Sequence, residues 1–516
     1  MQPSNSSADE SQSSQQIFLD SNLVVNERCL QQMFLHCSDV VFRKFRIHGK
    51  NDAILVFVDG LVDNQRIDQM ILKPLMYDNR SALAREDLVL FIKEQIVAVG
   101  QAKTTSDLDV VVAGVLSGET AIIMDRTTTA LILDVKGWMM RNVEEPSSES
   151  VIRGPREGFN ENIRTNTSLL RRKIKSPKLK LESLKIGDTS NTEIVIAYLE
   201  GIAKESLVQE VRERLKQIEI DCVLESGYIE EFIEDAPYSP FPTVQNTERP
   251  DVVAANLQEG RVAIMLDNTP FALIVPITFW GGLIANEDYY ERYWVGSVIR
   301  FIRFGALLVT LFLPAVYVAL TTYHQEMIPT SLLLSIAASR DPVPFPAIVE
   351  ALIMEITFEG LREAGLRLPR QVGQAVSIVG ALVIGQAAVQ AGIVSAAMVI
   401  VVAITGIASF TIPNFSLGIS LRILRFPFIF LAGILGLYGV TVGVMITLIH
   451  LCSLRSFGIS YLAPIAPMKL SSWKDIFVRA PWWKMNLRPE LITGSKASVR
   501  IPKGQKPDPE EGEGKG

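Results

Sequence analysis

An abrupt change in side-chain chemistry near residue 290 constrains this chain more than any other feature. Residues 1–290 place charged residues between short apolar runs, whereas residues 295–470 consist mainly of Leu, Ile, Val, Ala, Gly and Phe. A helix that spans a bilayer needs roughly 20 mostly apolar residues, and several segments of the second region reach that length. We therefore predict a multidomain membrane protein, with a soluble N-terminal domain followed by an all-α polytopic transmembrane domain.

Four stretches are the candidate spans: residues 301–320, 372–390, 392–412 and 426–451. Arg292, Arg300 and Arg303 precede or begin the first stretch, and basic residues of this kind mark the cytoplasmic side. The residues Tyr289, Tyr290, Tyr293 and Trp294 supply an interfacial aromatic belt at the same place. We expect the soluble domain in the cytoplasm. Later arginine clusters favour the same side, so the number of crossings stays open.

Six parts follow from these changes in composition. They are a disordered N-terminus (1–38), soluble subdomain 1 (39–145), a basic linker (146–190), soluble subdomain 2 (191–288), the transmembrane domain (289–470) and a cytoplasmic tail whose end is disordered (471–516). The first 16 residues are rich in Ser, Gln and Asn, which cannot bury enough apolar surface to fold. They also lack the basic start and apolar core of a signal peptide.

The soluble domain contains an internal duplication. "GETAIIMDRTTTALIL" (118–133) returns as "GRVAIMLDNTPFALIV" (260–275), and an ungapped match of 109–135 to 251–277 gives 12 identities in 27 positions. Chance would give about two. Each copy is predicted to be a ladder of short strands separated by turns, after an apolar run that leads into helix-patterned sequence. The fold class is therefore a duplicated α/β or α+β domain.

The duplicated aspartates Asp125 and Asp267 allow two interpretations. Their presence in both copies fits a catalytic pair, but an aspartate before Arg-Thr or Asn-Thr between two strands is typical of a turn. In that case the carboxylate bonds local backbone N–H groups. No partner residues for catalysis accompany them, so we favour the turn.

Composition argues against several classes of protein. The net charge of -6 gives no basic domain for nucleic acid. The four cysteines form no CxxC pair, which argues against a zinc site or a disulfide framework. No nucleophile, phosphate-binding or metalloprotease motif appears. We expect no enzymatic activity and no cofactor.

The linker contains two unusual stretches. The first is "RGPREGF", made of Arg153, Gly154, Pro155, Arg156, Glu157, Gly158 and Phe159. The second is basic and contains Arg171, Arg172, Lys173, Lys175, Lys178 and Lys180. A solvated connector explains the basic stretch, and so does a patch that meets anionic lipid headgroups or an acidic partner. We predict a coupling or interaction role for "RGPREGF", Arg171 and Arg172.

Residues 327–361 are the most unusual part of the apolar region. The segment Asp341–Pro346 carries Pro342, Pro344 and Pro346, which bar regular helix. The helix predicted after it carries Glu350, Glu355 and Glu359, with the last two about 40° apart on one face. Two interpretations stay open: a helix on the membrane surface with its acids in water, or a helix lining a pore whose acids favour cations. These residues are the candidate pore or gate.

Polar and small residues in the apolar stretches indicate helix packing. Gln386 and Gln390 lie one turn apart, and Asn414 is grouped with them as a packing candidate. Ala381, Gly385, Ala388 and Gly392 allow close helix contacts, and we therefore expect a homo-oligomer.

Several motifs together resemble the A subunit of the GerA-type nutrient germinant receptors of endospore-forming bacteria. They are "VFVDGLVD" (56–63), "RGPREGF" (153–159), "NTSLLRRKIK" (166–175), "AYLEGIA" (197–203), "RDPVPFP" (340–346), "LREAGLRLP" (361–369), "FTIPNFSLGISLRILRFPFI" (410–429) and "VRAPWW" (478–483). They occur in order and cover residues 38–490.

The resemblance implies a multi-pass protein of the spore inner membrane with a cytoplasmic N-terminal domain. It implies partners too: a transporter-like B subunit, a lipoprotein C subunit, further copies of the chain, and the phospholipid membrane. The family implies an oligomeric ion channel opened by a nutrient. The alternatives are a SpoVAF-type accessory channel without its own nutrient, and a secondary transporter. A transporter is disfavoured because the clear repeat lies in the soluble part.

Overall fold

The structure is a computed structural model that describes residues 17–77, 88–93, 99–137, 146, 149, 151–368, 383–468, 475–489, 492–493 and 499–500. It contains two compact units. The first unit comprises Met1–Ser150, Arg156–Ile229 and Thr247–Ala272, and the second comprises Val151–Pro155, Glu230–Asn246 and Leu273–Gly516.

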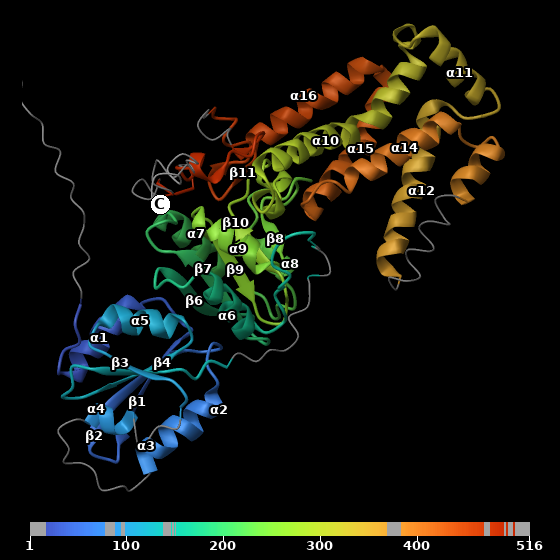
Figure 1. The fold of residues 1–516 in the computed structure, drawn as a ribbon. Helices are drawn as coiled ribbons and strands as arrows, with labels where there is room; N and C mark the ends of the chain where they lie inside the picture. The colour runs from blue at the N-terminus through green and yellow to red at the C-terminus, as the bar shows by residue number, and fades with distance from the viewer. Residues whose placement is uncertain are drawn as a thin grey trace, which may run out of the picture. The chain divides into compact units, whose positions relative to one another are not determined.

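The first lobe, residues 17–137, is a five-stranded antiparallel sheet with helices on both faces (Figure 1). The strands are β1 (Val40–Ile47), β2 (Asn51–Val58), β3 (Ala102–Thr105), β4 (Thr120–Met124) and β5 (Ala130–Leu133), in the order β1-β2-β4-β5-β3. The helices are α1 (Leu23–Met33), α2 (Asn64–Arg66), the π-helical η1 (Ile67–Leu72), α3 (Lys73–Tyr77), α4 (Leu88–Phe91) and α5 (Leu108–Leu116).

The alternation of side chains along β2 explains the two apolar layers of this lobe. Ile54, Val56 and Val58 face one layer, which also contains Leu30 of α1 and Val111 of α5. The side chains between them, such as Leu55, face a second layer with residues of η1 and α3. Successive strand residues point to opposite faces, so a strand that is apolar at every position from Ala53 to Val58 lies between two helical layers.

The second lobe, residues 156–275, repeats this topology. Its strands are β6 (Leu179–Ile186), β7 (Thr192–Leu199), β8 (Gln245–Thr247), β9 (Val262–Leu266) and β10 (Ala272–Val275), in the order β6-β7-β9-β10-β8. Its helices are α6 (Ile163–Lys173), α7 (Glu205–Lys216), α8 (Ser226–Ile233) and α9 (Pro250–Gln258). The two sheets have the same strand order, as the sequence duplication predicts.

Three expectations about the soluble half need correction. The apolar runs at 109–116 and 251–258 are helices α5 and α9, not strands: the Asp107 side chain caps α5, and Pro250 starts α9. The predicted disorder up to residue 38 is wrong from Leu23 on, because α1 buries Leu23 and Leu30 in the lobe. The predicted linker is wrong for α6 and β6, which are integral to the second lobe.

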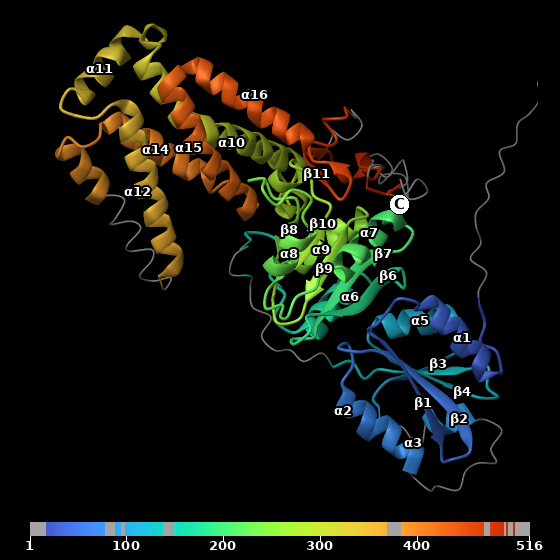
Figure 2. The ribbon, with the colours of Figure 1, turned by 180° about the vertical axis from the view of Figure 1, so that it is seen from behind.

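The second unit contains the apolar helices. They are α10 (Tyr293–Thr322), α11 (Thr330–Arg340), α12 (Ala347–Arg367), α14 (Ala396–Ser409), α15 (Phe415–Leu435) and α16 (Leu437–Ser453). Short 3₁₀ turns η3 (Gly281–Leu283), η4 (Asn286–Tyr289), η5 (Gln325–Met327) and η7 (Trp482–Lys484) and the hairpin β11 (Arg455–Ser456) and β12 (Ile459–Ser460) accompany them. Both ribbon views place α10, α14 and α15 side by side (Figure 2).

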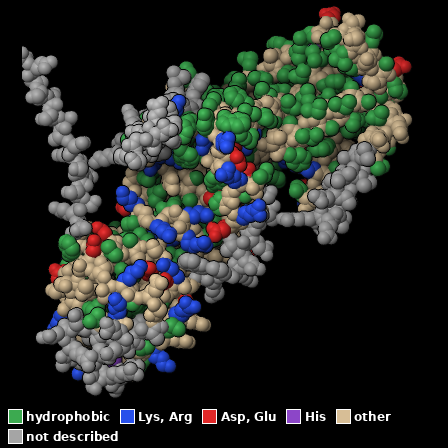
Figure 3. Space-filling view, viewed as in Figure 1, with side chains coloured by type: hydrophobic (Ala, Val, Ile, Leu, Met, Phe, Trp, Pro, Cys, Tyr) green, Lys and Arg blue, Asp and Glu red, His purple; other side chains and the backbone are tan. Residues whose placement is uncertain are grey.

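Two of these helices, α10 and α15, are long and apolar enough to cross a bilayer, and α14 and α16 are shorter apolar helices. Hydrophobic side chains cover much of the visible face of this helical region (Figure 3). The predicted span 426–451 is divided between α15 and α16 at Gly436, which has a φ of 62°. Part of the predicted span 372–390 lies outside the described residues.

A glutamate–arginine ladder in the helical unit

Glu350 is the first of three acids on α12 and is fully buried. Its carboxylate accepts hydrogen bonds from Nε of Arg340 at 3.2 Å and from the backbone N–H of Ser395 at 3.0 Å. Arg340 is the last residue of α11, and Ser395 caps α14. One buried carboxylate therefore joins three helices.

Glu355 is the second acid and is also fully buried. Nη1 of Arg425, on α15, donates to its Oε2, and Nε of the same arginine donates to the carbonyl oxygen of Thr310 on α10 at 2.9 Å. Charge-assisted bonds of this kind are among the strong hydrogen bonds of proteins. Glu355 and Arg425 thus connect α12, α15 and α10 in an apolar interior.

Glu359 is the third acid and is half-buried, one helical turn after Glu355. Its carboxylate lies 3.0 Å from Nη2 of Arg362 and 3.5 Å from Nε of Arg422 on α15. We call Glu350, Glu355 and Glu359, with Arg340, Arg362, Arg422 and Arg425, the glutamate–arginine ladder. The Glu355–Arg425 and Glu359–Arg422 pairs cross between α12 and α15.

The ladder changes the interpretation of the predicted pore residues. A helix on the membrane surface would leave the acids in water, and an acid ring would leave them unpaired. In the described residues each of the three acids has an arginine within 4 Å. The sequence does not predict these partners, because the later arginine clusters, of which Arg422 and Arg425 form one, are typical of the cytoplasmic side. Both arginines are buried. Their spacing is a signal that could have identified them: residues three or four apart lie on one face of a helix, so Arg422 and Arg425 can face the two glutamates Glu359 and Glu355.

The proline-rich segment connects α11 to α12. Asp341, Pro342, Pro344 and Pro346 are exposed, and Pro346 is the residue before α12. The carbonyl of Pro342 packs against Gly392, where an added Cβ would lie 3.0 Å from the oxygen. A role for this segment as a gate remains a prediction.

The arginines that precede the first predicted span also differ from expectation. Nη1 of Arg303 lies 2.7 Å from Oδ2 of Asp288, and Nε of Arg300 lies 3.1 Å from the same oxygen. Arg300 contacts Asp475 as well. Arg300 and Arg303 are buried, and acids neutralise their charge. Of the three arginines used to predict the cytoplasmic side, Arg292 alone is exposed.

The basic linker residues have distinct environments. Arg171 is fully buried, and its Nε and Nη2 donate to the carboxylate of Asp39 in the first lobe at 2.9 and 2.8 Å. Burial disfavours the Arg171 cation, but the Asp39 carboxylate outweighs it and the pKa of Arg171 is raised. Both predicted roles of the basic stretch, a solvated connector and a patch for lipid or an acidic partner, need exposed side chains. For Arg171 that expectation is wrong. Arg172 and Lys173 pair with Glu157 at 3.1 and 3.4 Å.

The "RGPREGF" residues are divided between the two units after Pro155. In the second unit, Arg153 lies 3.6 Å from Glu291, and Gly154 has a φ of 144°. In the first unit, the N–H of the buried Phe159 donates to the carbonyl of Glu248 at 2.7 Å. Pro155 and Glu157 are partly buried, Gly158 is buried, and Arg156 is exposed. Their coupling role remains a prediction.

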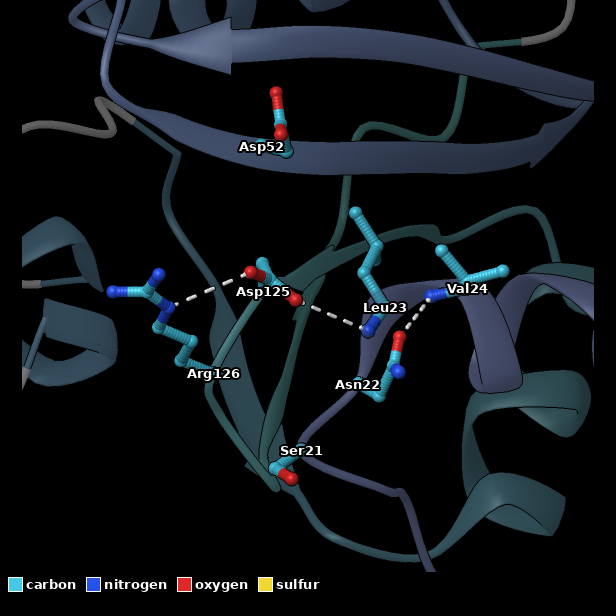
Figure 4. Close-up of a pocket in the computed structure, with 7 residues that line it drawn as sticks. All are labelled: Ser21, Asn22, Leu23, Val24, Asp52, Asp125 and Arg126. Atoms are coloured by element: carbon cyan, nitrogen blue, oxygen red, sulfur yellow. Dashed lines mark hydrogen bonds and ion pairs between the residues drawn. The ribbon is translucent and has the colours of Figure 1, made fainter.

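The duplicated aspartates bond the first helix of each lobe. Oδ1 of Asp125 accepts from the N–H of Leu23 at 3.3 Å, and Oδ1 of Asp267 accepts from the N–H of Ile163 at 3.1 Å. Figure 4 shows Asp125 at a hollow that Asp52 and Arg126 also line. This geometry fits a structural role for both aspartates rather than a catalytic one. The predicted partners are wrong in one respect: the bonded N–H groups are more than 100 residues away in the sequence, not local.

The packing candidates lie at different places. Gln386 and Gln390 are exposed in the single chain. Asn414 is the N-cap of α15, where its side chain accepts from the N–H of Leu417 at 2.9 Å. Its role in the chain is therefore to start a helix.

Comparison with known proteins identifies the class to which this architecture belongs. The model of the family described as Bacillus/Clostridium GerA spore germination protein matches residues 28–491. The chain is 50% identical over 482 residues to the uncharacterized membrane protein YfkQ of Bacillus subtilis, covering 93% of each chain. It is 48% identical over 475 residues to spore germination protein KA of B. subtilis, covering 92% of this chain and 87% of that protein.

One solved structure is also similar: the N-terminal domain of the A subunit of the Bacillus megaterium spore germinant receptor GerK3. The identity is 38% and the TM-score 0.42, over 51% of this chain and 98% of that chain. The chain belongs to the GerA family of spore germination proteins, the family of germinant receptor A subunits.

Proposed function

We propose that this protein is the A subunit of a nutrient germinant receptor in the spore inner membrane. In this proposal the helical unit crosses the membrane and, in an oligomer of several copies, conducts ions when a nutrient is sensed. A transporter-like B subunit and a lipoprotein C subunit are its partners, the lobes lie in the cytoplasm, and the chain acts as a receptor component rather than as an enzyme.

The observation that carries the channel proposal is the glutamate–arginine ladder. Removing two charges from water is expensive, and a buried ion pair often stabilises a fold less than apolar residues of the same volume would. Ionisable residues inside apolar helices that cross a membrane therefore usually mark an ion path or a switch. Glu350 and Glu355 are both fully buried among such helices.

The ladder also supports a mechanism for gating. While Arg425 holds Glu355 and Arg422 lies beside Glu359, α12 and α15 stay together and the acids are neutralised. Movement of α12 away from α15 would break these pairs and expose carboxylates, which favour cations. We infer that the paired arrangement is the closed state and that nutrient binding shifts the population toward the unpaired one.

The test uses spores that carry the chain as a Glu355→Gln variant in place of the unaltered protein. A neutral amide leaves Arg425 buried and uncompensated, which costs about 3–5 kcal/mol. If only the closed state bears this cost, Glu355→Gln spores release ions and germinate without nutrient. The matched control is Glu363→Gln, because Glu363 is on the same helix but exposed, and it pairs with the exposed Arg367 at 2.7 Å.

A double variant separates gating from misfolding. Glu355→Gln with Arg425→Gln removes the uncompensated charge and is expected to restore much of the nutrient dependence. Immunoblots report the abundance of each variant. Normal nutrient-dependent germination of Glu355→Gln spores with normal protein abundance would refute the gating role. A deletion strain that is slow toward every nutrient alike would instead identify an accessory channel.

A further inference from the structure

The C-terminal segment around η7 packs against the start of α10. The rings of Tyr293 and Trp483 are 6.2 Å apart in an edge-to-face arrangement, and those of Tyr289 and Trp482 are 5.6 Å apart. Arg479 lies over both Tyr289 and Trp482. Aromatic pairs and cation–π contacts of this kind fix their elements together. The motif "VRAPWW" therefore builds one surface with the first long apolar helix.

This surface exposes the amphipathic rings of Tyr and Trp at one end of the helix and purely apolar side chains after them. Tyr293 and Trp294 are 45% and 56% exposed. Val298, Phe301 and Ile302, the next exposed residues on α10, are more than half exposed. Trp and Tyr prefer the boundary between headgroups and acyl chains because their rings are amphipathic. The order of side chains matches a bilayer entered from its surface.

The exposed charge at the same place is positive. Arg292 and Lys484 are exposed, and neither forms an ion pair with any residue in the part of the chain that the structure describes. Two nearby acids already have basic partners: Glu291 lies near Arg153, and Asp475 near Arg300. An anion that approaches this end of α10 therefore meets two cations whose charge no described acid neutralises.

We propose that Arg292, Tyr293, Trp294, Trp483 and Lys484, here called the collar, bind the headgroup of an anionic phospholipid. Arg292 and Lys484 contact the phosphate, and the rings contact the glycerol and upper acyl region. Exposed apolar residues beside the rings favour a lipid over an acidic protein, which would leave them in water. The inference rests on the membrane crossing proposed above but not on ion conduction.

The test is competitive lipid binding to the purified full chain in mixed micelles that contain equal amounts of phosphatidylglycerol and phosphatidylcholine. Native mass spectrometry counts the retained lipids of each kind. Each basic residue near a membrane surface contributes about fivefold in affinity for anionic lipid, so we expect about a thirtyfold loss of phosphatidylglycerol preference in the double variant Arg292→Gln with Lys484→Gln. Arg367→Gln is the matched control, because Arg367 is 80% exposed at the end of α12.

Two results overturn the proposal. One is equal retention of the two lipids by the unaltered chain, which would assign the collar to another class of partner. The other is an unchanged preference in the double variant. Circular dichroism in phosphatidylcholine micelles checks folding, and Trp294→Leu, which keeps both cations, should lower retention of both lipids without changing their ratio. Because no germination or conductance is measured, this inference and the channel proposal can fail independently.

Discussion

Replacing Arg171 by glutamine is expected to separate the two lobes without unfolding either of them. Arg171 lies on α6 of the second lobe and is fully buried, with two bonds to Asp39 of the first lobe and two to the carbonyls of Ser176 and Leu179. Next to this pair, the N–H of Ser38 donates to the carbonyl of Leu181 at 2.9 Å. The edge strand β6 is thereby covered by the first lobe.

The magnitude follows from the buried charge. Glutamine cannot neutralise Asp39, and removing one partner of a buried ion pair costs about 3–5 kcal/mol. At about 1.4 kcal/mol for each factor of ten, the equilibrium for opening the contact shifts by about a hundredfold to several-thousandfold. The two apolar layers of the first lobe do not contain Arg171. In the second lobe the inner strands β7 and β9 are buried at nearly every position, so both sheets are expected to stay folded.

Hydrogen exchange of the full chain in detergent, read by mass spectrometry, measures this shift. Faster exchange is expected for peptides that contain residues 36–39 and 179–182, because the N–H of Leu181 donates to the carbonyl of His36 across the contact. Peptides from the inner strands β4 and β9 should keep their protection. Arg172→Gln is the matched control, since Arg172 is partly exposed and a surface pair contributes about 0–1 kcal/mol. Unchanged exchange at 179–182 in Arg171→Gln, or loss of protection throughout both sheets, would refute the reasoning.

Three further predictions concern single positions. Burial raises the pKa of Glu149 from its ordinary value near 4.5 to about 7. Between these pH values the folded protein holds a proton that the unfolded chain has released, so the free energy of unfolding should fall as pH rises from about 4.5 to 7. Denaturant unfolding should therefore show that Glu149→Gln stabilises the protein at pH 8 but not at pH 4. An identical pH dependence in both proteins would contradict this. Asn162→Ala removes the N-cap of α6, whose side chain accepts from two backbone N–H groups, and should lower the unfolding free energy by about 1 kcal/mol; no change in the denaturation midpoint would show that the cap is dispensable. Gly392→Ala places a Cβ 3.0 Å from the carbonyl of Pro342 at a φ of +65° and should lower the thermal midpoint, unlike Gly305→Ala, where nothing lies within 4 Å.

The duplication could be predicted from sequence only in part. The matching strands near Asp125 and Asp267 share enough identities to be aligned, whereas α1 and α6 do not. Their equivalence lies in shared bonds: Asn22 and Asn162 cap the two helices, and the side chains of Asn26 and Asn166 accept from the N–H groups of Asp20 and Asn160. Both capping asparagines can be found in the sequence. The short polar stretches that contain them, however, have no hydrophobic periodicity that would predict the helices that follow.

The glutamate–arginine ladder also could be predicted from local sequence patterns only in part. Composition located the apolar region and the acids of α12, because hydropathy and helical spacing are local properties. The partners of those acids lie 70 and 63 residues further along the chain, at Arg425 and Arg422. Such pairing depends on how α12 packs against α15, which no local pattern fixes. For the same reason the arginines before the first span gave a topology signal that Asp288 neutralises in the folded chain.

Ion flux across proteoliposomes that contain the full chain with the proposed B and C subunits tests the central claim most directly. A panel of amino acids, sugars and salts supplies the nutrients, and a potassium-selective electrode reports release. We expect flux on addition of at least one nutrient, nutrient-independent flux for Glu355→Gln, and normal gating for Glu363→Gln. No flux with any nutrient, or flux that Glu355→Gln leaves unaltered, would contradict the account.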